Sequence, residues 1–171
     1  MRVRKCTFSD LPRVIRIERA SFGPEAYSVT TFLAHVFRDR KGLFVIENDE
    51  GCVVGYALAR VGLRWLGIRR GGLTSIAVDP AHRRCGFGTA LLASALDYLR
   101  ENGVEEADLE VNVSNCAAQS LYESLGFVRS RVLPHYYGPD QNGLKMVLNM
   151  RRAAAPTDVA QPSGAQRSPN G

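Results

Sequence analysis

Residues 73–99 read LTSIAVDP, then AHRRCGFG, then TALLASALDYL. The first segment predicts a β-strand, because Ile76 and Val78 place β-branched side chains at period two and Pro80 cannot donate a ladder hydrogen bond. The third segment predicts a helix from residue 89, because its leucines and alanines recur at helical spacing. A strand, a loop and a helix in this order are typical of an α/β fold.

The connecting loop has the composition of an anion site. Gly86 and Gly88 let the backbone turn sharply and leave its N–H groups uncovered at a helix N-terminus, where partial positive charge favours a phosphate. Arg83 and Arg84 add two positive charges. No Gly-Lys-Ser/Thr follows the glycines and the three-glycine dinucleotide fingerprint is incomplete, so two common phosphate motifs are excluded. The alternative is a surface loop whose glycines serve only to start the helix.

Composition predicts one folded domain. The chain has 171 residues, is 45% hydrophobic and 23% charged, and can bury one sizeable core. Residues 153–171 are rich in Ala, Pro, Ser and Gln and have no apolar period, which predicts a flexible tail. We therefore expect a domain over residues 1–152 and a tail over residues 153–171.

Charge and cysteine usage exclude several classes of function. The formal charge of +5 lies partly in the tail and no predicted helix has a continuous basic face, which argues against nucleic acid as the primary ligand. The four cysteines and the three histidines lack the spacing of a metal site or a disulfide framework, and the histidines are expected at the surface. No apolar run approaches the roughly 20 residues of a transmembrane helix, and no signal-peptide core follows the first residues. We expect a soluble, cytoplasmic protein that needs no metal and binds no membrane.

The remaining segments alternate between helix and strand. Helices are expected over residues 11–20 after the cap candidates Ser9 and Asp10, after a cap at Ser28, and over residues 115–125. Strands are expected over residues 3–7, 43–47, 52–61, 107–111, 127–132 and 144–150. Residues 62–72 and 135–140 are interpreted as loops.

A carboxylate interrupts one predicted central strand. Glu110 lies between Leu109 and Val111, so it projects to the opposite sheet face from both. A carboxylate at such a position is costly unless it faces water, a partner or a site. Glu110 is therefore a candidate functional residue.

Two blocks of sequence resemble one enzyme superfamily. Arg-x-x-Gly-x-Gly over residues 83–88 resembles the pyrophosphate-binding signature of the GNAT superfamily of acetyl-coenzyme A-dependent N-acetyltransferases. LEV at 109–111, SN at 114–115, AA at 117–118 and LYESLGF at 121–127 resemble the second block of the ribosomal-protein N-terminal alanine acetyltransferases and their archaeal and eukaryotic relatives. The resemblance implies an α/β GNAT fold with a mixed central sheet of about six to seven strands flanked by about four helices.

The same resemblance implies acetyl-coenzyme A as cosubstrate. The coenzyme contacts that it implies are Ile76, Ala77, Val78, Arg83, Arg84, Cys85, Gly86, Phe87, Gly88 and Thr89, with Asn115 and Tyr122 from the second block. In the family a backbone N–H of the strand holds the thioester oxygen as negative charge develops on it. Asn is also favoured at helix N-caps, so Asn115 has a structural alternative.

Two proton carriers follow from the resemblance, with Glu110 as acceptor and Tyr122 as donor. An α-amine attacks a thioester only as the free base and titrates at about pH 7.7 to 8.0, so a base is needed at neutral pH. A tyrosine, with a pKa near 10, can supply a proton to the departing thiolate. The alternatives are a solvent-facing or structurally paired Glu110 and a Tyr122 buried in the core with its hydroxyl bonded.

Two aromatic segments are implied as borders of a peptide site, Phe22, Glu25 and Tyr27 in one and Tyr136 and Tyr137 in the other. We therefore expect acetyl transfer to the N-terminal α-amine of proteins or peptides, ribosomal proteins among them, by a monomer or homodimer. Acetylation of lysine side chains or of a small amine is the alternative within enzymes. A coenzyme-binding module without catalysis is the alternative outside them.

Overall fold

The computed structural model describes residues 1–151, except for the side chains of Glu25 and Trp65. The strands are β1 (Arg2–Lys5), β2 (Leu43–Glu47), β3 (Val53–Trp65), β4 (Ile68–Val78), β5 (Glu106–Asn112), β6 (Val128–Gly138) and β7 (Gln141–Asn149). The α-helices are α1 (Leu11–Phe22), α2 (Val29–Arg38), α3 (Phe87–Glu101) and α4 (Cys116–Ser124), with short 3-10 turns η1 (Phe8–Asp10), η2 (Gly23–Glu25), η3 (Arg40–Gly42) and η4 (Pro80–His82). The predicted tail over residues 153–171 lies outside the described residues, so the domain boundary stays a prediction.

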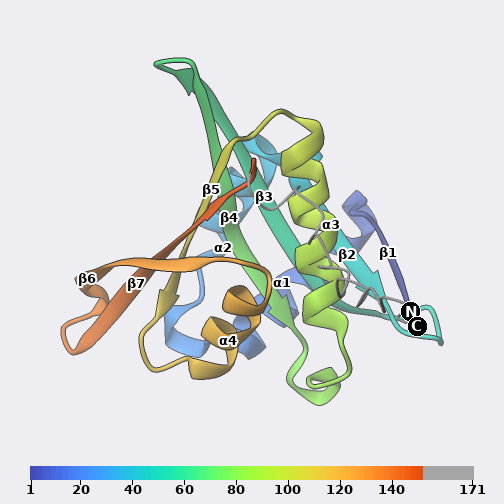
Figure 1. Ribbon diagram of the computed structural model, residues 1–171. Helices are drawn as coiled ribbons and strands as arrows, with labels where there is room; N and C mark the ends of the chain where they lie inside the picture. The colour runs from blue at the N-terminus through green and yellow to red at the C-terminus, as the bar shows by residue number, and fades with distance from the viewer. Residues whose placement is uncertain (152–171) are drawn as a thin grey trace, which may run out of the picture.

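The expected mixed α/β sheet is confirmed, with seven strands in the order β1-β2-β3-β4-β5-β7-β6 (Figure 1). Neighbouring strands are antiparallel except β4 and β5, which are parallel. Pro134 lies in β6 at one edge of the sheet, where a missing backbone N–H does not interrupt the ladder. The one parallel pair separates an antiparallel N-terminal half from an antiparallel C-terminal half.

The sheet around β2 is buried on both faces, and β2 shows this in its sequence. Leu43 and Val45 pack into one hydrophobic cluster with α1 and α2, whereas Phe44 and Ile46 pack into a second cluster with α3. Because successive side chains of a strand point to opposite faces, a strand covered on both sides is a continuous apolar run. Figure 1 shows α3 on one side of this sheet and α1 and α2 on the other.

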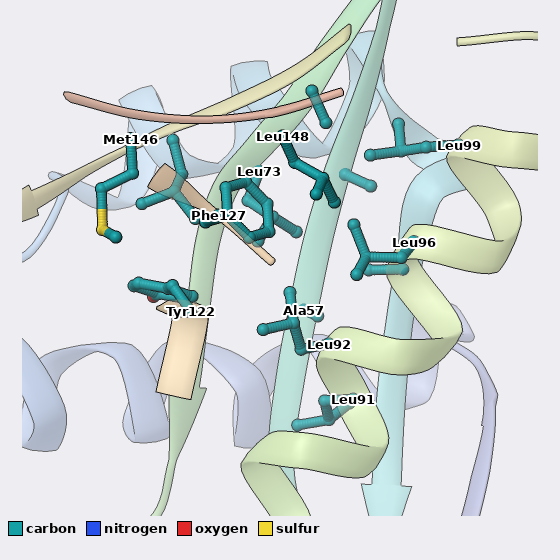
Figure 2. Packing of buried hydrophobic residues seen from close by; sticks show 14 of the residues in the cluster. Ala57, Leu73, Leu91, Leu92, Leu96, Leu99, Tyr122, Phe127, Met146 and Leu148 are labelled. Carbon is teal, nitrogen blue, oxygen red and sulfur yellow. The ribbon is translucent and has the colours of Figure 1, made fainter. Parts of the chain in front are cut away.

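The longest helix, α3, connects the two halves of the sheet through its leucines. Leu91, Leu92 and Leu99 are fully buried, and Figure 2 shows this stripe facing the sheet, with Phe127 and Met146 of the C-terminal half in the same cluster. Full burial of each leucine stabilises the fold by about 1.5–3 kcal/mol. Within residues 1–151, neither α3 nor any other helix combines the length and apolarity needed to cross a membrane.

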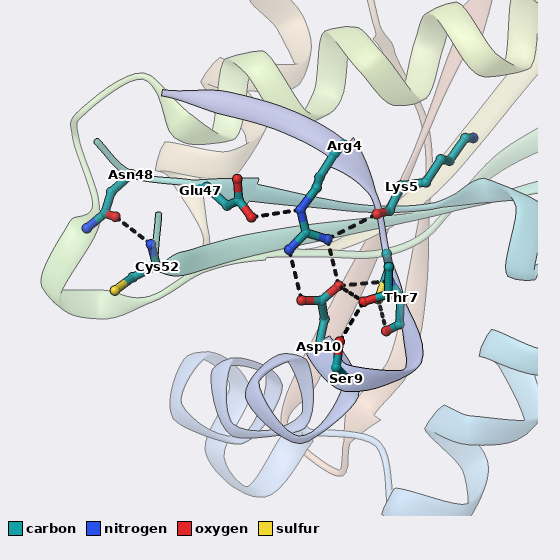
Figure 3. Close-up of polar contacts among 9 residues, drawn as sticks. Arg4, Lys5, Thr7, Ser9, Asp10, Glu47, Asn48 and Cys52 are labelled. Atoms are coloured by element: carbon teal, nitrogen blue, oxygen red, sulfur yellow. Dashed lines mark hydrogen bonds and ion pairs between the residues drawn. The ribbon is translucent and has the colours of Figure 1, made fainter. Parts of the chain in front are cut away.

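An arginine fixes the start of α1 against the edge of the sheet. Arg4 of β1 pairs with Glu47 of β2 and with Asp10, both at 2.7 Å, as Figure 3 shows. The hydrogen bond from Arg4 and those from Thr7 hold the pKa of Asp10 well below its usual range. Asp10 is the N-cap residue of α1, one of the two candidates, but the expected capping bond from its side chain is not made, and Ser9 bonds Thr7 instead. The cap at Ser28 is confirmed, because its hydroxyl accepts from the Thr31 N–H at 3.1 Å.

Two predicted loops are strands. Residues 62–72 form the ends of β3 and β4, which are joined by a turn with positive φ at Leu66 and Gly67. The outer part of this hairpin, residues 63–68, extends beyond the rest of the sheet (Figure 1) and its described side chains are exposed, so its sequence shows no apolar alternation. Residues 135–138 belong to β6, where His135 has a φ of 56° and the register with β7 shifts, which is typical of a bulge.

The helix after the glycine loop begins two residues earlier than predicted. Gly86 is its N-cap with a φ of 79°, and Phe87 is the first residue of α3. Gly88 therefore lies in the first turn of the helix and not in the loop. A Cβ at Gly88 would meet Leu121 of α4 at 3.4 Å, so this glycine lets the start of α3 approach α4.

The parallel pairing of β4 and β5 is short and depends on close backbone contact. Residues 70–72 pair with residues 106–108, and the pairing ends there. A Cβ at Gly72 would lie 2.0 Å from the carbonyl oxygen of Asp108, so only glycine fits. Beyond this point β4 and β5 diverge, and the space between them opens toward the carboxyl ends of both strands.

We expect Gly72→Ala to lower the free energy of unfolding by about 1–3 kcal/mol, because the added methyl group would overlap the backbone carbonyl of Asp108. Denaturant titration measures this change. Gly88→Ala is the matched control, since its Cβ meets its nearest neighbour at 3.4 Å and Ala is favoured over Gly in a helix. Equal destabilisation of the two variants would show that the β4–β5 contact does not require glycine.

Candidate active site

Two cavities lie along the divergence of β4 and β5. The larger has a volume of about 940 Å³ and lies between the end of β4, the loop before α3, and α4. The smaller has a volume of about 490 Å³ and lies between β4, β5, the segment after α1, and the end of β6. The two share lining residues from four elements: Phe22, Ile76, Asn112, Asn115, Ala118 and Tyr122. The two cavities therefore adjoin, and a ligand that contacts these shared residues lies against the walls of both.

The larger cavity contains the predicted anion site. Its lining includes every predicted coenzyme contact except Cys85, which is exposed on the same loop. The first N–H groups of α3 have no partner within the helix and carry the positive end of its dipole. Arg83 and Arg84 are exposed beside them and line the same cavity. This end of the site has positive potential and backbone donors, which suits an anionic group.

One histidine lies in this wall contrary to the surface position expected for it. His82 is partly buried, and its Nδ1 lies 3.9 Å from Asp79. Among the described residues that nitrogen has no hydrogen-bond partner. His82 therefore lines the larger cavity as a residue, while its Nδ1 is buried.

The backbone of β4 is partly free along both cavities. Its pairing with β5 stops at Gly72, and a register shift against β3 leaves Thr74 unpaired between Leu73 and Ser75. The Thr74 hydroxyl is buried without a hydrogen-bond partner among the described residues. The β5-facing edge of the strand, which includes residues 76–78, can therefore bond a ligand.

Glu110 faces the smaller cavity from β5. The burial pattern of the strand alternates, with Leu109 and Val111 buried on the other face as expected. The Glu110 side chain is 24% exposed, and its carboxylate lies 3.8 Å from Lys145 Nζ. Lys145 is closer to Asp108, at 2.7 Å. The carboxylate of Glu110 is thus held loosely by one cation and is open to the cavity.

Tyr122 of α4 lies where the two cavities meet. Its ring packs edge-on against Phe127, with centroids 5.9 Å apart, and only 7% of the residue is exposed. Burial raises the pKa of Tyr122 to about 12, so its hydroxyl stays protonated throughout the physiological range. Tyr122 thus has the buried core position of the structural alternative and also lines both cavities, and its role as proton donor stays a prediction.

Asn115 also combines a structural position with a place in both cavity walls. Its side-chain oxygen accepts from the Ala118 N–H at 3.1 Å, which confirms the predicted N-cap of α4. The residue is exposed and lines both cavities. Capping uses the amide oxygen and leaves the amide N–H₂ group for a ligand.

Aromatic side chains from distant segments border the smaller cavity. Phe22 and Tyr27 come from the end of α1 and the segment after it, and Tyr136 and Tyr137 come from β6. The rings of Tyr136 and Tyr137 meet edge to face with centroids 5.0 Å apart. Desolvation raises the pKa of Tyr137, so this wall is neutral. The Glu25 side chain lies outside the described part of the chain, and its predicted role stays a prediction.

A second carboxylate lines the smaller cavity and was not predicted. Glu18 of α1 is only 2% exposed, and its burial raises its pKa. Its spacing from Val14 and Ser21 places it on the buried stripe of the helix, which is the signal that sequence reasoning passed over. Ser75 of β4 was also missed, because serine in a strand carries no distinctive pattern.

Known proteins are similar to this chain in sequence and in fold. Residues 11–127 match the acetyltransferase (GNAT) family. The chain belongs to this family. An N-alpha-acetyltransferase of Sulfurisphaera tokodaii is 37% identical over 153 residues, which cover 85% of this chain and 90% of the relative. The predicted superfamily and its enzyme class, an N-acetyltransferase, are confirmed.

Solved structures agree with the fold. The ribosomal-protein-S18-alanine N-acetyltransferase of Escherichia coli matches with a TM-score of 0.75 and 31% identity, over 87% of this chain and 93% of that chain. A NatC complex bound to a Gag peptide and CoA matches with a TM-score of 0.79 at 21% identity, over 86% of this chain and 97% of that chain. The latter likeness shows the fold alone. Within residues 1–151, no group of three or more His, Cys, Asp and Glu is placed to hold a metal ion.

Proposed function

We propose that this N-acetyltransferase transfers the acetyl group of acetyl-coenzyme A to the N-terminal α-amine of proteins or peptides. The observation that carries the proposal is the shared wall at Tyr122, which joins a cavity with a basic helix N-terminus to an aromatic cavity with an open carboxylate. Relatives named for the same activity support it. Ribosomal proteins are among the proposed targets, because the E. coli neighbour is named for one.

The larger cavity fits acetyl-coenzyme A by its donors and by its space. The N-terminus of α3, Arg83 and Arg84 would hold the pyrophosphate, because backbone N–H groups and guanidinium groups are the usual donors to phosphate. A Cβ at Gly86 would meet no atom of the described residues within 4 Å, so the backbone there is open to a ligand. The free edge of β4 lies on the path from this anion site to Glu110. The cosubstrate supplies an activated acyl carbon, which the residues below serve.

Glu110 serves as the base in this proposal. The amine nitrogen must lose a proton as its bond to the acyl carbon forms, and an α-amine is partly protonated at neutral pH because it titrates at about 7.7 to 8.0. The Glu110 carboxylate accepts that proton directly or through one water. Lys145 lies nearer to Asp108 than to Glu110, which leaves the Glu110 oxygens available.

Tyr122 serves as the acid. As the carbon–sulfur bond breaks, the departing thiolate takes the proton of the Tyr122 hydroxyl, which its buried position keeps protonated. A backbone N–H within residues 76–78 stabilises the negative charge that develops on the thioester oxygen. One proton leaves the amine and one reaches the sulfur, so the protein regains its starting state after proton exchange with water.

The aromatic walls favour a peptide terminus over a lysine side chain. Tyr27 and Tyr137 border the smaller cavity from two sides and would close over the backbone of the first few residues. An α-amine also loses its proton more easily than lysine, whose pKa is near 10.4, and each unit of difference is worth about 1.36 kcal/mol. Lysine or small-amine acetylation remains the alternative enzyme activity, and a monomer or homodimer in the cytoplasm stays our prediction.

Short peptides with free N-termini should be acetylated at least about tenfold faster than the same peptides blocked at the N-terminus and carrying an internal lysine. Purified protein, acetyl-coenzyme A and mass spectrometry of the products measure both rates, with a polyamine as a third substrate. Equal rates on free and blocked peptides would support the lysine or small-amine alternative. Coenzyme binding without turnover on any substrate would support the non-catalytic one.

Glu110→Gln and Tyr122→Phe should each lower turnover by about 10²- to 10⁴-fold. The loss of turnover in Glu110→Gln should be largest at low pH. There most of the substrate amine is protonated, so its deprotonation depends on the base. In the wild type, ionisation of Tyr122 should cause no loss of rate between about pH 8 and about pH 10, because its pKa is about 12. Glu106→Gln is the control, an acid on the same face of β5 that pairs with Arg70 at 3.2 Å. Full activity of both site variants across this range would make the two assignments wrong.

Gly86→Val should weaken acetyl-coenzyme A binding at least about tenfold, because a β-branched residue is strained at a φ of 79° and shifts the N–H groups that start α3. Titration calorimetry measures the affinity. Gly51→Val carries the same strain at a φ of 76° in the turn between β2 and β3 and should bind normally. Wild-type affinity in a folded Gly86→Val protein would remove this loop from the coenzyme site.

A further inference from the structure

The buried carboxylate of Glu18 connects three separate elements beside the smaller cavity. Its Oε1 accepts a hydrogen bond from the Tyr27 backbone N–H at 3.2 Å. Its Oε2 accepts from the Tyr56 hydroxyl of β3 and from the Ser75 hydroxyl of β4, the latter at 3.3 Å. The Tyr56 and Ser75 hydroxyls also contact each other at 2.7 Å. One side chain of α1 thus holds the segment before α2 against the sheet.

This carboxylate is unsuited to proton transfer with a substrate. A carboxylate has about four acceptor positions, and three donors of the chain already use Glu18. The residue is only 2% exposed, so its oxygens point into the protein although the residue lines the cavity. Glu110 differs on both counts, since its side chain is 24% exposed and its nearest cation lies at 3.8 Å.

Two of the three donors belong to the walls of the cavity. Tyr27 borders it from the α1–α2 side, and Ser75 borders it from β4. Tyr56, the third donor, is fully buried and packs edge-on against Phe32 of α2, with ring centroids 5.6 Å apart. We call the side of the cavity that Tyr27 borders the Tyr27 wall. Its position relative to β4 depends on the hydrogen bonds that Glu18 accepts.

We propose that Glu18 is a positioning residue that fixes the Tyr27 wall against β4 and so sets the affinity for the acceptor peptide, without taking part in proton transfer. The inference rests on the proposed function, because the acceptor is taken to be a peptide N-terminus. It adds a specificity-determining group to the peptide side and leaves the coenzyme side unchanged.

Two substitutions separate position from charge. Glu18→Gln keeps an oxygen for the Tyr27 N–H, and its amide N–H₂ can donate to the Tyr56 and Ser75 hydroxyls, which rotate to accept. Glu18→Leu removes both acceptor oxygens, and with them all three hydrogen bonds, at similar side-chain size. We expect Glu18→Leu to raise the peptide KM at least about tenfold, with kcat and the acetyl-coenzyme A KM within about threefold of wild type. We expect Glu18→Gln to stay within about threefold of wild type in all three constants.

The matched control is Asp10→Leu. Asp10 is another buried carboxylate at the opposite end of α1, only 8% exposed, and it bonds Arg4 and Thr7 (Figure 3). None of these three residues lines either cavity. This variant should lose stability in denaturant titration and keep the wild-type peptide KM. If Glu18→Leu does not fold, Tyr56→Phe takes its place, because it removes one donor and should raise the peptide KM by about two- to fivefold.

Amide hydrogen exchange at Tyr27, followed by NMR, tests the anchor without reference to activity. Exchange should be at least about tenfold faster in Glu18→Leu than in wild type and unchanged in Asp10→Leu. An unchanged Tyr27 exchange rate, or an unchanged peptide KM in folded Glu18→Leu, overturns the inference. So does a Glu18→Gln variant that loses kcat mainly at low pH, since that pattern assigns proton transfer to Glu18. Faster Tyr27 exchange in a protein that acetylates no free N-terminus would instead retain the anchor and reject the proposed function.

Discussion

The short parallel contact between β4 and β5 is the constraint on which the site depends. The strands pair over residues 70–72 and 106–108 only, at a separation that allows no side chain on Gly72. Because the pairing stops there, one edge of β4 stays free and β5 presents Glu110 and Asn112 to the gap. A sheet paired along its full length would place its own hydrogen bonds where the two cavities now lie.

The core determines which charges meet at this gap. The buried leucines of α3 hold the helix against the sheet, so its N-terminus lies beside the end of β4 with Arg83 and Arg84 next to it. Glu110 lies in the other cavity, with Tyr122 at the shared wall. Positive potential at one end suits an anionic coenzyme, and negative charge at the other suits an amine that arrives as a cation.

Two buried carboxylates fix the two ends of α1. Asp10 bonds Arg4 and so connects the start of the helix to β1, whereas Glu18 connects its later turns to β3 and β4. Each buried charge has several donors, as the cost of burying it requires. The segment that follows α1 is held by the second of these anchors through the Tyr27 backbone, so the Glu18 end of the helix and the shape of the smaller cavity are linked.

Local sequence patterns determined the strand, glycine loop and helix over residues 73–101, the caps at Ser28 and Asn115 and the face of Glu110, because these depend on periodicity and on neighbours a few residues apart. The β3–β4 hairpin was missed, since a ribbon outside the core has no buried face to impose an apolar period. Only the tertiary structure brought Glu18 to Ser75, 57 positions along the chain, and placed the rings of β6 opposite Tyr27. Such contacts arise from packing between whole elements, which no local pattern encodes.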